Sequence, residues 1–400
     1  MKVLMVNKFL YPNGGSEAYM FRLGNQLEAM GHDVQYFGME NEGRCVSNAA
    51  ELYTTSMNFH GGSKLKKITY PVKTIYSHES MRKMRKVLDD FKPDAVHLNN
   101  FNYQLTPTVI LAAADWSRRT GHKCRIIYTA HDYQLVCPNH MCYRPPDKSP
   151  CEECLNGSFS GCIKHRCIHG SAAKSAVGWA EAAFWRHNNV YEKLDAVICC
   201  SQFMKSKLDT NPTLCTKTTV MHNFINSAPH IEAHKRDYVL YFGRFSHEKG
   251  IDTLLKACKA LPEIQFVFAG TGPLAKKLDG VPNIKNVGFK HGEALQKLIA
   301  QARFSVCPSE WYENCPLSVM ESIAAGTPVI GAKIGGIPEV MRSDVDGILF
   351  ESGNAADLTE RIRELWCDSE RLARYTNACR TAQYDTVQQY ADKILEIYRG

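Results

Sequence analysis

Two positively charged residues on one predicted loop have types and a spacing that suggest a chemical role. Arg244 and Lys249 lie in the segment Gly-Arg-Phe-Ser-His-Glu-Lys-Gly, residues 243–250, directly after an apolar stretch typical of a strand. Positive charges beside the start of a helix bind anions, and two of them can clamp a diphosphate. Glu248 between them also fits an ordinary solvated basic loop. We therefore predict an anion site here, with a solvated loop as the alternative.

Two carboxylates lie close together in the second half of the chain. Glu313 and Glu321 belong to residues 308–321, and Pro316 between them is the predicted first residue of a helix, where the missing N–H is not needed. A carboxylate accepts two hydroxyl hydrogen bonds, which suits the vicinal diols of sugars and ribose. In the alternative interpretation, Glu313 only complements the helix dipole, and Glu321 lies on a solvated helix face.

The first half of the chain contains two further loops of interest. Gly14 and Gly15 precede a helix whose predicted N-cap is Ser16, and paired glycines there let the main chain approach a phosphate closely. The GxGxxG spacing of a dinucleotide site is absent. His131-Asp132 ends a predicted strand and could bind a substrate hydroxyl or transfer a proton. A tight turn and a structural histidine are the alternatives.

Sixteen cysteines are the unusual number in this composition, and six of them lie within a short segment: Cys137, Cys142, Cys151, Cys154, Cys162 and Cys167. Four thiolates at such spacings can close a tetrahedral structural zinc site. A loop of free thiols or redox pairs is the alternative. The other ten cysteines are predicted to be small core residues.

Strands that alternate with helical patterns must position these loops. The predicted strands of the first half are residues 2–7, 34–37, 95–98, 125–129 and 196–199, and those of the second half are 238–242, 265–269, 304–307, 328–331 and 348–350. This alternation implies two parallel sheets covered by helices, hence two α/β domains. The two domains join within the polar segment 211–235. We expect ligands to bind at the carboxyl ends of the strands in both domains.

Composition excludes several classes of protein. Hydrophobic residues make up 44% and charged residues 22% of the chain, as in a globular protein, and no apolar run approaches the roughly 18 residues of a membrane span. The net charge of +7 suits an anionic ligand or membrane surface but decides little alone. Residues 1–7 lack a signal-peptide pattern, so we expect a cytoplasmic protein with reduced thiols.

In chain order, these motifs resemble those of a retaining glycosyltransferase of family 4. The resemblance rests on Gly14-Gly15, His131-Asp132, Gly243-Arg244 with Lys249, Gly270-Thr271-Gly272 and Glu313-x7-Glu321, and it extends over nearly the whole chain. It implies the GT-B fold, in which two Rossmann-like domains face each other across a cleft. Residues 1–220 would form the acceptor domain with the cysteine-rich insert 137–170, residues 221–380 the donor domain, and residues 381–400 a helix that crosses back onto the first domain.

The resemblance also implies roles for single residues around a nucleoside-diphosphate sugar, with UDP as the favoured nucleotide. Arg244 and Lys249 would bind the diphosphate and stabilise its charge in the transition state. His131 and Glu313 would lie at the reacting sugar, and Glu321 would hold the ribose. The remaining donor contacts would come from Gly14, Gly15, Gly270, Gly288, Asn314, Cys315, Pro316 and Leu317.

The same resemblance predicts a hexosyltransferase that acts on a saccharide or lipid-linked saccharide acceptor in bacterial-type surface polysaccharide biosynthesis. Because the cations neutralise the diphosphate, no catalytic metal is expected, and the Asp344-Val345-Asp346 string is predicted to be a polar turn. Some family members that build such polysaccharides carry a similar cysteine run. On that pattern the structural zinc ligands would be Cys137, Cys151, Cys154 and Cys167.

Residues 64–86 carry eight basic residues against the single acid Glu79, interleaved with apolar ones. Such a helix suits peripheral contact with an anionic membrane, here the inner face of the plasma membrane, and a solvated basic helix is the alternative. Two other functions need features that the sequence does not show. A nucleotide-sugar epimerase or phosphorylase of the same fold would need a catalytic carboxylate or a pyridoxal-lysine site. A zinc-containing nucleic-acid-binding protein would need base-stacking aromatics or a recognised module beside the basic segment, so we expect no nucleic-acid partner.

Overall fold

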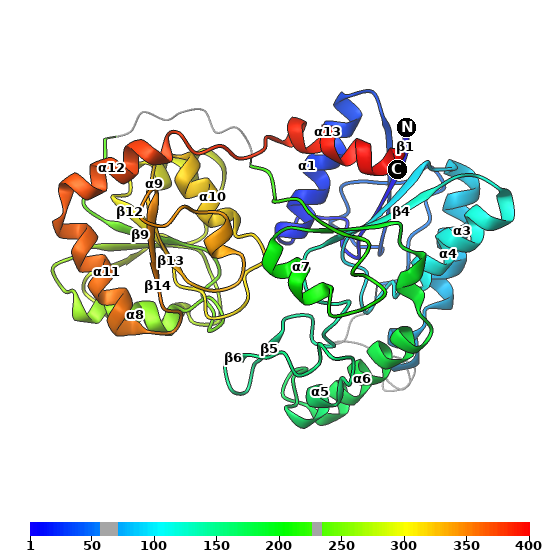
Figure 1. The fold of residues 1–400 in the computed structure, drawn as a ribbon, viewed down its shortest axis with the longest axis horizontal. Helices are drawn as coiled ribbons and strands as arrows, with labels where there is room; N and C mark the ends of the chain where they lie inside the picture. The colour runs from blue at the N-terminus through cyan, green and yellow to red at the C-terminus, as the bar shows by residue number, and fades with distance from the viewer. Residues whose placement is uncertain (57–70, 226–233) are drawn as a thin grey trace. The chain divides into compact units, whose positions relative to one another are not determined.

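The computed structural model describes residues 1–56, 71–225 and 234–400, which form two compact units (Figure 1). Unit 1 comprises Met1–Pro146, Cys151–Met221 and Val387–Gly400. Unit 2 comprises Asp147–Pro150 and His222–Thr386. The last 14 residues thus return to the first unit, although they follow the second unit in the chain.

Unit 1 is built on a six-stranded, wholly parallel sheet of order β2-β1-β3-β4-β7-β8. Its strands are β1 (Lys2–Val6), β2 (Asp33–Phe37), β3 (Ala95–Leu98), β4 (Arg125–Ala130), β7 (Ala196–Cys199) and β8 (Thr218–Val220). The chain reverses its direction across the sheet between β1 and β3. In open α/β sheets, ligands bind at such a switch point, beside the carboxyl ends of the strands.

Unit 2 contains a second six-stranded parallel sheet, of order β11-β10-β9-β12-β13-β14. Its strands are β9 (Val239–Phe242), β10 (Phe266–Ala269), β11 (Ile284–Asn286), β12 (Phe304–Cys307), β13 (Val329–Ala332) and β14 (Gly347–Phe350). This is the strand order of a Rossmann fold, with its switch point between β9 and β12. The predicted fold class, two α/β domains with parallel sheets, is therefore confirmed.

Helices cover both faces of each sheet because right-handed crossovers in opposite directions lie on opposite faces. In unit 1, α3 (His78–Phe91) packs against α4 (Thr108–Thr120), whereas α1 (Gly15–Ala29) packs against α13 (Val387–Arg399) (Figure 1). In unit 2, α8 (Ile251–Ala260) packs against α11 (Ala355–Cys367), and α9 (Gly292–Gln301) contacts α10 (Leu317–Ala324). Further helices are α5 (Ser160–Lys164), α6 (Ala172–His187), α7 (Gln202–Leu208) and α12 (Ser369–Cys379), with 3-10 turns at Val190–Lys193, Ala275–Leu278 and Ile337–Glu339.

Hydrogen bonds fasten the C-terminal helix α13 to the core of unit 1. The hydroxyl of Tyr398 lies 2.5 Å from Nδ1 of His97 in β3, and the hydroxyl of Tyr390 lies 2.9 Å from that of Tyr19 in α1. His97 is fully buried, and its Nε2 contacts the hydroxyl of Thr129 at 2.7 Å. Burial lowers the pKa of His97 to about 3, so the ring is neutral and acts in this network without a charge.

Two predicted helix starts are wrong by one residue or more. Helix α1 begins at Gly15 with Gly14 as its N-cap, so Ser16 lies inside the first turn. The Ser16 hydroxyl accepts a hydrogen bond from Asn100 Nδ2 (2.9 Å) instead of capping the helix. Helix α10 begins at Leu317, and Pro316 is its N-cap in an extended conformation rather than its first helical residue.

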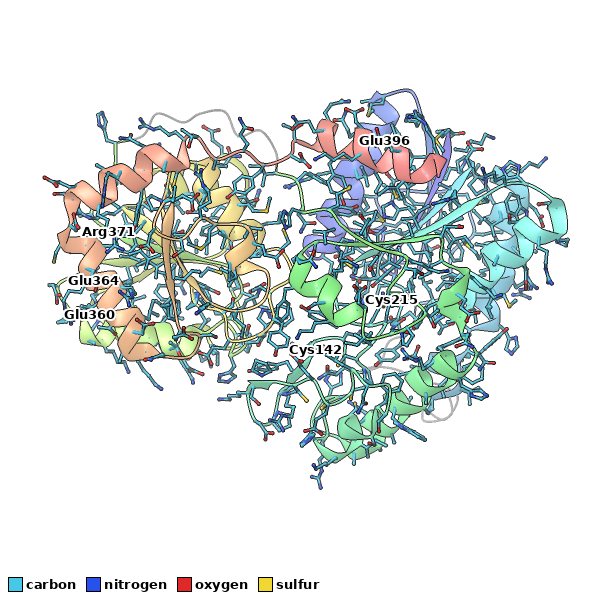
Figure 2. The ribbon with its side chains drawn as sticks, in the orientation of Figure 1. Cys142, Cys215, Glu360, Glu364, Arg371 and Glu396 are labelled. Carbon is cyan, nitrogen blue, oxygen red and sulfur yellow. The ribbon has the colours of Figure 1, made fainter. Side chains whose placement is uncertain are left out.

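The cysteine-rich insert follows β4 and consists mostly of turns and short elements. It contains the strands β5 (Tyr143–Arg144) and β6 (Ser149–Pro150) and leads through α5 into α6. Cys142 lies in this insert, whereas Cys215, also labelled in Figure 2, follows α7 and is exposed. The prediction that all ten other cysteines are core residues is wrong for Cys45, Cys215 and Cys367, which are exposed, because each lies in a loop or at a helix end.

Candidate functional site

The switch point of unit 2 brings a cation and a carboxylate together. The loop after β9 carries Lys249, and the loop after β12 carries Glu313. Their Nζ and Oε1 atoms lie 2.7 Å apart. Ser309 donates a hydrogen bond of 2.5 Å to the same Oε1, and the Lys249 ammonium lies 5.0 Å from the centre of the Trp311 ring. The sheet thus joins two residues that are 64 positions apart in the sequence.

Each member of this ion pair keeps the other charged. Burial alone would raise the pKa of Glu313, but the Lys249 ammonium and the hydrogen bonds hold it below its ordinary value. Burial would likewise lower the pKa of Lys249, but the charge of Glu313 raises it above its usual range. Glu313 is 5% exposed, so this is a fixed, nearly dry charge pair at the carboxyl end of the sheet.

Arg244 lies on the same loop as Lys249 but is not part of this pair. Its side chain is exposed, and its guanidinium makes no hydrogen bond or ion pair within the described part of the chain, while its main-chain carbonyl accepts from Tyr241 (2.8 Å).

The loop turns sharply at Gly250, where φ is +71° and a side chain would collide with the main-chain carbonyl of Pro308. Glycine is required there because the two loops approach each other closely.

The other predicted donor contacts lie on neighbouring loops of unit 2. Gly270 follows β10 and donates its N–H to the carbonyl of Gly288 (2.9 Å), which follows β11, so the loops after these two strands lie side by side. Residues 314–317 lead into α10. Within them the side chain of Cys315 is buried, and its Sγ accepts a hydrogen bond from the main-chain N–H of Asn223 (3.4 Å). Glu321 lies on α10 and is partly exposed.

A second polar group occupies the switch point of unit 1. The Asn7 side chain accepts from the N–H of Asn100 (2.9 Å) and donates to Glu17 (2.9 Å), and the N–H of Lys8 donates to the carbonyl of Asn100 (2.7 Å). These contacts fasten the loop after β1, which contains Gly14 and Gly15, to the loop after β3. Both glycines lie at the N-terminus of α1, where unpaired N–H groups favour an anion.

His131 lies at the carboxyl end of β4, next to this group. Its Nε2 is 2.8 Å from Oδ1 of Asn99, and Tyr19 packs against the ring edge with centroids 4.8 Å apart. Burial lowers the pKa of His131 to about 3, so the ring is neutral at pH 7. Since Asn99 Oδ1 only accepts, Nε2 carries the proton, and Nδ1 is the acceptor nitrogen.

Asp132 and His140 extend the polar layer toward the insert. Burial raises the pKa of Asp132 to about 6, although the charge of Lys8 and the N–H of Gln134 oppose this rise. His140 stacks on Tyr103 with ring centroids 4.8 Å apart, and its Nδ1 lies 3.9 Å from Asp132. The polar layer beside β4 therefore contains two neutral histidines and the Asp132 carboxyl, whose pKa burial raises to about 6.

The asparagines of unit 1 were not predicted as site residues from the sequence. Asn7, Asn99 and Asn100 follow directly on β1 and β3, and all three connect the loops at the switch point. The signal was present, because polar amides at the ends of two apolar strands are expected to meet at one sheet edge. Glu17 was missed as well. It lies in the first turn of α1 and is 2% exposed.

The structure does not support the predicted zinc site. The described residues contain no group of three or more His, Cys, Asp or Glu side chains placed to hold a metal ion, so Cys137, Cys151, Cys154 and Cys167 are not assembled as ligands. The Cys137 thiol instead donates a hydrogen bond to the side-chain oxygen of Asn139 (3.0 Å). Cys154, Cys162 and Cys167 also pack with Phe159 in a small hydrophobic cluster.

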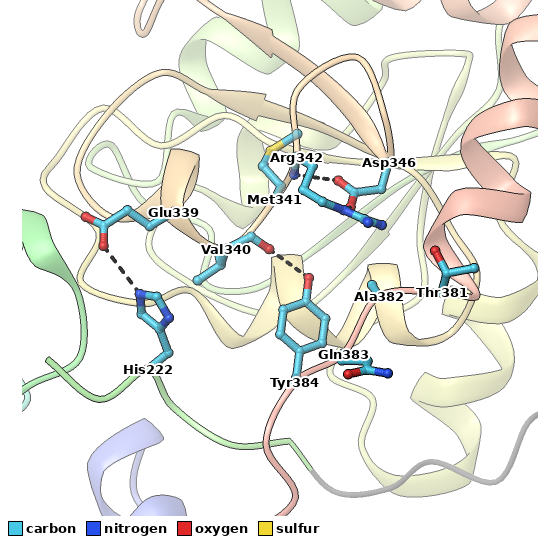
Figure 3. Close-up of a pocket in the computed structure, with 10 residues that line it drawn as sticks. All are labelled: His222, Glu339, Val340, Met341, Arg342, Asp346, Thr381, Ala382, Gln383 and Tyr384. Atoms are coloured by element: carbon cyan, nitrogen blue, oxygen red, sulfur yellow. Dashed lines mark hydrogen bonds and ion pairs between the residues drawn. The ribbon is translucent and has the colours of Figure 1, made fainter.

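A cavity of about 380 Å³ lies in unit 2, between the loop after the 3-10 turn Ile337–Glu339 and the segment 381–384 (Figure 3). On its lining, His222 contacts Glu339 (3.3 Å), and the Tyr384 hydroxyl donates to the carbonyl of Val340 (2.7 Å). The buried Asp346 accepts from the main chain of Arg342 (2.7 Å) and from its guanidinium (2.6 Å). Asp346 therefore serves the loop structure, in agreement with the polar turn expected for residues 344–346.

The basic segment predicted to contact a membrane is only partly described. Lys64, Lys66 and Lys67 lie outside the described residues. On α3, Lys83 is paired with Glu79 (2.8 Å) and Arg85 with Asp115 (3.1 Å), so part of its charge is neutralised within the unit. Among the described residues, no helix has the length and apolar character needed to cross a membrane.

The chain matches two protein-family models. Residues 13–228 match the model described as Glycosyltransferase Family 4, and residues 224–382 match the model described as Glycosyl transferases group 1. An uncharacterised 42.6 kDa protein in the cps region of Klebsiella pneumoniae is 24% identical over 380 residues, which are 88% of this chain and 93% of that protein.

Solved structures share the fold over the full length of the chain. Anabaena HepE in complex with UDP superposes with a TM-score of 0.67 at 17% identity and covers 100% of both chains. Sucrose-phosphate synthase of Thermosynechococcus elongatus has a TM-score of 0.69 at 16% identity and covers 100% of this chain and 98% of its own. At this level of identity the likeness concerns the fold alone, and it confirms the prediction of two Rossmann-like domains.

Proposed function

Because the chain belongs to glycosyltransferase family 4, we propose that it transfers a sugar, with retention of anomeric configuration, from a nucleoside-diphosphate sugar to a saccharide or lipid-linked saccharide. The similarity to a protein of a cps region supports a role in surface polysaccharide biosynthesis. UDP is the proposed nucleotide, because the structurally similar HepE was solved with UDP. With a lipid-linked acceptor, the enzyme would work in the cytoplasm at the inner face of the plasma membrane.

The Lys249–Glu313 pair is the observation that carries the proposal. A protonated lysine oriented by a buried carboxylate at the Rossmann switch point is a preorganised hydrogen-bond donor for the proposed diphosphate. The exposed Arg244 guanidinium supplies the second cation and needs to break no contact within the described chain to do so. Together they stabilise the charge that the diphosphate gains as the bond to the sugar breaks.

The remaining donor contacts follow from the loops around this pair. Glu313 and the main chain of residues 314–317 would hold the sugar, and Glu321 the ribose diol. Gly270 and Gly288 would border the base. The first turn of α1, with Gly14 and Gly15, would contribute N–H groups to the distal phosphate.

His131 is the proposed contact to the reacting sugar in unit 1. As a neutral imidazole fixed by Asn99, it can accept a hydroxyl hydrogen bond at Nδ1 without adding charge next to the diphosphate. No residue is assigned as a covalent nucleophile. In the proposed same-face reaction, the acceptor hydroxyl attacks as the diphosphate leaves, and a phosphate oxygen takes the hydroxyl proton.

Titration calorimetry with UDP, GDP and an oligonucleotide, combined with a hydrolysis screen over common UDP and GDP sugars, tests this proposal. We expect UDP to bind, an α-linked donor to yield an α-linked product, and Arg244→Ala to weaken UDP binding about tenfold to a hundredfold, the loss of one charge-assisted hydrogen bond. Arg363→Ala is the matched control, because Arg363 is also exposed in unit 2 but pairs with Glu360 on α11.

Several results would contradict the proposal. Oligonucleotide binding without nucleotide binding would favour a nucleic-acid-binding protein. An epimerised nucleotide sugar without any transfer product would favour an epimerase. Equal UDP affinity for Arg244→Ala and the parent protein would refute the diphosphate clamp.

A further inference from the structure

Helix α6, which follows the cysteine-rich insert, carries an apolar and basic surface that the proposed donor and acceptor sites do not use. Its buried residues are Ser175, Gly178, Glu181 and Trp185. All its exposed and half-exposed residues are either apolar (Ala172, Ala173, Ala176, Val177, Trp179, Ala180, Ala182, Ala183 and Phe184) or basic (Lys174, Arg186 and His187). Its one acid, Glu181, is 2% exposed, so the outer face of α6 carries no negative charge.

Three large apolar side chains are exposed on this helix and on the segment that adjoins it. Trp179 is 39% exposed and Phe184 is 40% exposed, both on α6. Val72 is 68% exposed and lies one helical turn before Tyr76. The Tyr76 ring stacks on Trp185 at 5.7 Å and contacts the Phe184 ring at 6.4 Å. Among the described residues, only Phe289 and Val345 are comparable, and both lie in unit 2.

Positive charge surrounds these apolar side chains. Lys164 and Arg166 are exposed on and just after α5, which packs against α6, and Lys73 is exposed beside Val72. The acids of the preceding loop, Glu152 and Glu153, are engaged in ion pairs with Lys207 (2.7 Å) and His165 (2.9 Å), respectively. The surface of α6 is therefore complementary to a negatively charged partner.

We propose that α6, together with Val72, docks on the surface of a lipid bilayer that contains anionic lipid. Exposed aromatic side chains beside basic ones suit the headgroup region of a bilayer, where amphipathic rings and positive charges both find partners. Trp179 and Phe184 would insert beside the acyl chains, while Lys164, Arg166 and Lys174 would contact anionic headgroups. The partner is a membrane surface because nothing on the face requires a directed hydrogen bond.

This docking deepens the proposed function, because a lipid-linked acceptor would be presented at the same surface. The docking itself does not depend on the proposed function, since vesicle binding is measured without donor or acceptor. It overlaps the contact predicted for residues 64–86 only at Val72 and Lys73, because it rests mainly on exposed apolar side chains of α6 rather than on the charges of α3.

Flotation of the full chain with vesicles is the test. We expect binding to phosphatidylcholine vesicles with about 30% phosphatidylglycerol, weak binding to phosphatidylcholine alone, and weakening by high salt. The double variant Trp179→Ala/Phe184→Ala should lower the partition coefficient at least tenfold, and Lys164→Gln/Arg166→Gln should lower it on anionic vesicles only. Phe289→Ala, which removes an exposed aromatic of unit 2, is the matched control and should leave binding unchanged.

Circular dichroism melting of each variant separates loss of docking from loss of folding, and Trp179→Ala alone serves if the double variant unfolds. Binding that ignores lipid charge, or that persists in Trp179→Ala/Phe184→Ala, would overturn the proposal. So would an absence of vesicle binding together with concentration-dependent self-association through α6, because the face would then be a protein interface.

Discussion

Replacing Lys249 by methionine should destabilise unit 2 by a predictable amount. Methionine keeps most of the apolar stem but removes the ammonium that lies 2.7 Å from Glu313. At that distance and an effective dielectric constant of about 20, the gross attraction is roughly 6 kcal/mol, most of which offsets the cost of desolvating the two charges. Breaking a buried pair costs about 3–5 kcal/mol because one charge is left uncompensated. We expect about 3 kcal/mol, since 28% of the Lys249 side chain is exposed and Ser309 still binds the carboxylate.

The pH dependence of this loss follows from the same pair. In the parent protein the folded-state pKa of Glu313 lies below its ordinary value, so the pair contributes at neutral pH and its contribution is lost as the pH falls through that pKa. Without Lys249, burial raises the folded-state pKa above the unfolded one, so the variant gains stability as the pH falls. The difference in unfolding free energy between parent and variant should therefore shrink between pH 7.5 and pH 5.

Urea unfolding, followed by tryptophan fluorescence, measures these differences. The double variant Lys249→Met/Glu313→Gln should lie within about 1 kcal/mol of the parent, because no buried charge is left unpaired. The control Lys277→Met removes a lysine from its 2.6 Å pair with Asp252 at an exposed site and should cost less than about 1 kcal/mol. If the Lys249 and Glu313 single-variant effects add within about 0.5 kcal/mol, the two residues do not interact, and the reasoning is refuted.

Three further predictions concern other parts of the chain. Tyr398→Phe removes the hydrogen bond to His97 and should lower the free energy of unfolding by about 1 kcal/mol; unchanged stability would contradict the docking of α13. Burial raises the pKa of Glu181 to about 8, so the folded state retains a proton that the unfolded chain has lost. The parent should therefore lose roughly 3 kcal/mol between pH 5 and pH 8, whereas Glu181→Gln should lose much less; parallel pH profiles would contradict this. Gly250→Ala should lower the free energy of unfolding by more than about 2 kcal/mol, because the new side chain would meet the carbonyl of the loop after β12. The control Gly280→Ala, at a similar φ but in open space, should lower it by about 1 kcal/mol. Equal losses would mean that backbone strain is the only effect and would contradict the collision.

Much of the fold could be predicted from the sequence. The apolar stretches that became β1, β4, β9 and β12 were recognisable, and so were the loops after them that carry Gly14, His131, Lys249 and Glu313. This succeeds because strand and turn preferences are local, and because parallel strands place their following loops at one edge of the sheet.

The insert could not be predicted in the same way. Spacing alone made Cys137, Cys151, Cys154 and Cys167 a plausible set of ligands, but the described residues contain no group of three or more side chains placed to hold a metal ion. A segment of turns has no periodicity that orients its side chains, so thiol positions depend on packing against α6 and its neighbours. Helix starts failed for a related reason, since Ser16 bonds to Asn100 of a distant loop rather than to its own helix.

Residue types, strand positions and the order of the loops follow from the sequence, because they depend on side-chain chemistry and short-range backbone preferences. The pairings that give those residues a function depend on tertiary structure. Lys249 meets Glu313, and His131 meets Asn99, only because β9 lies beside β12 and β3 beside β4. Burial at these junctions then sets which groups are charged, and no property of the isolated segments could supply that.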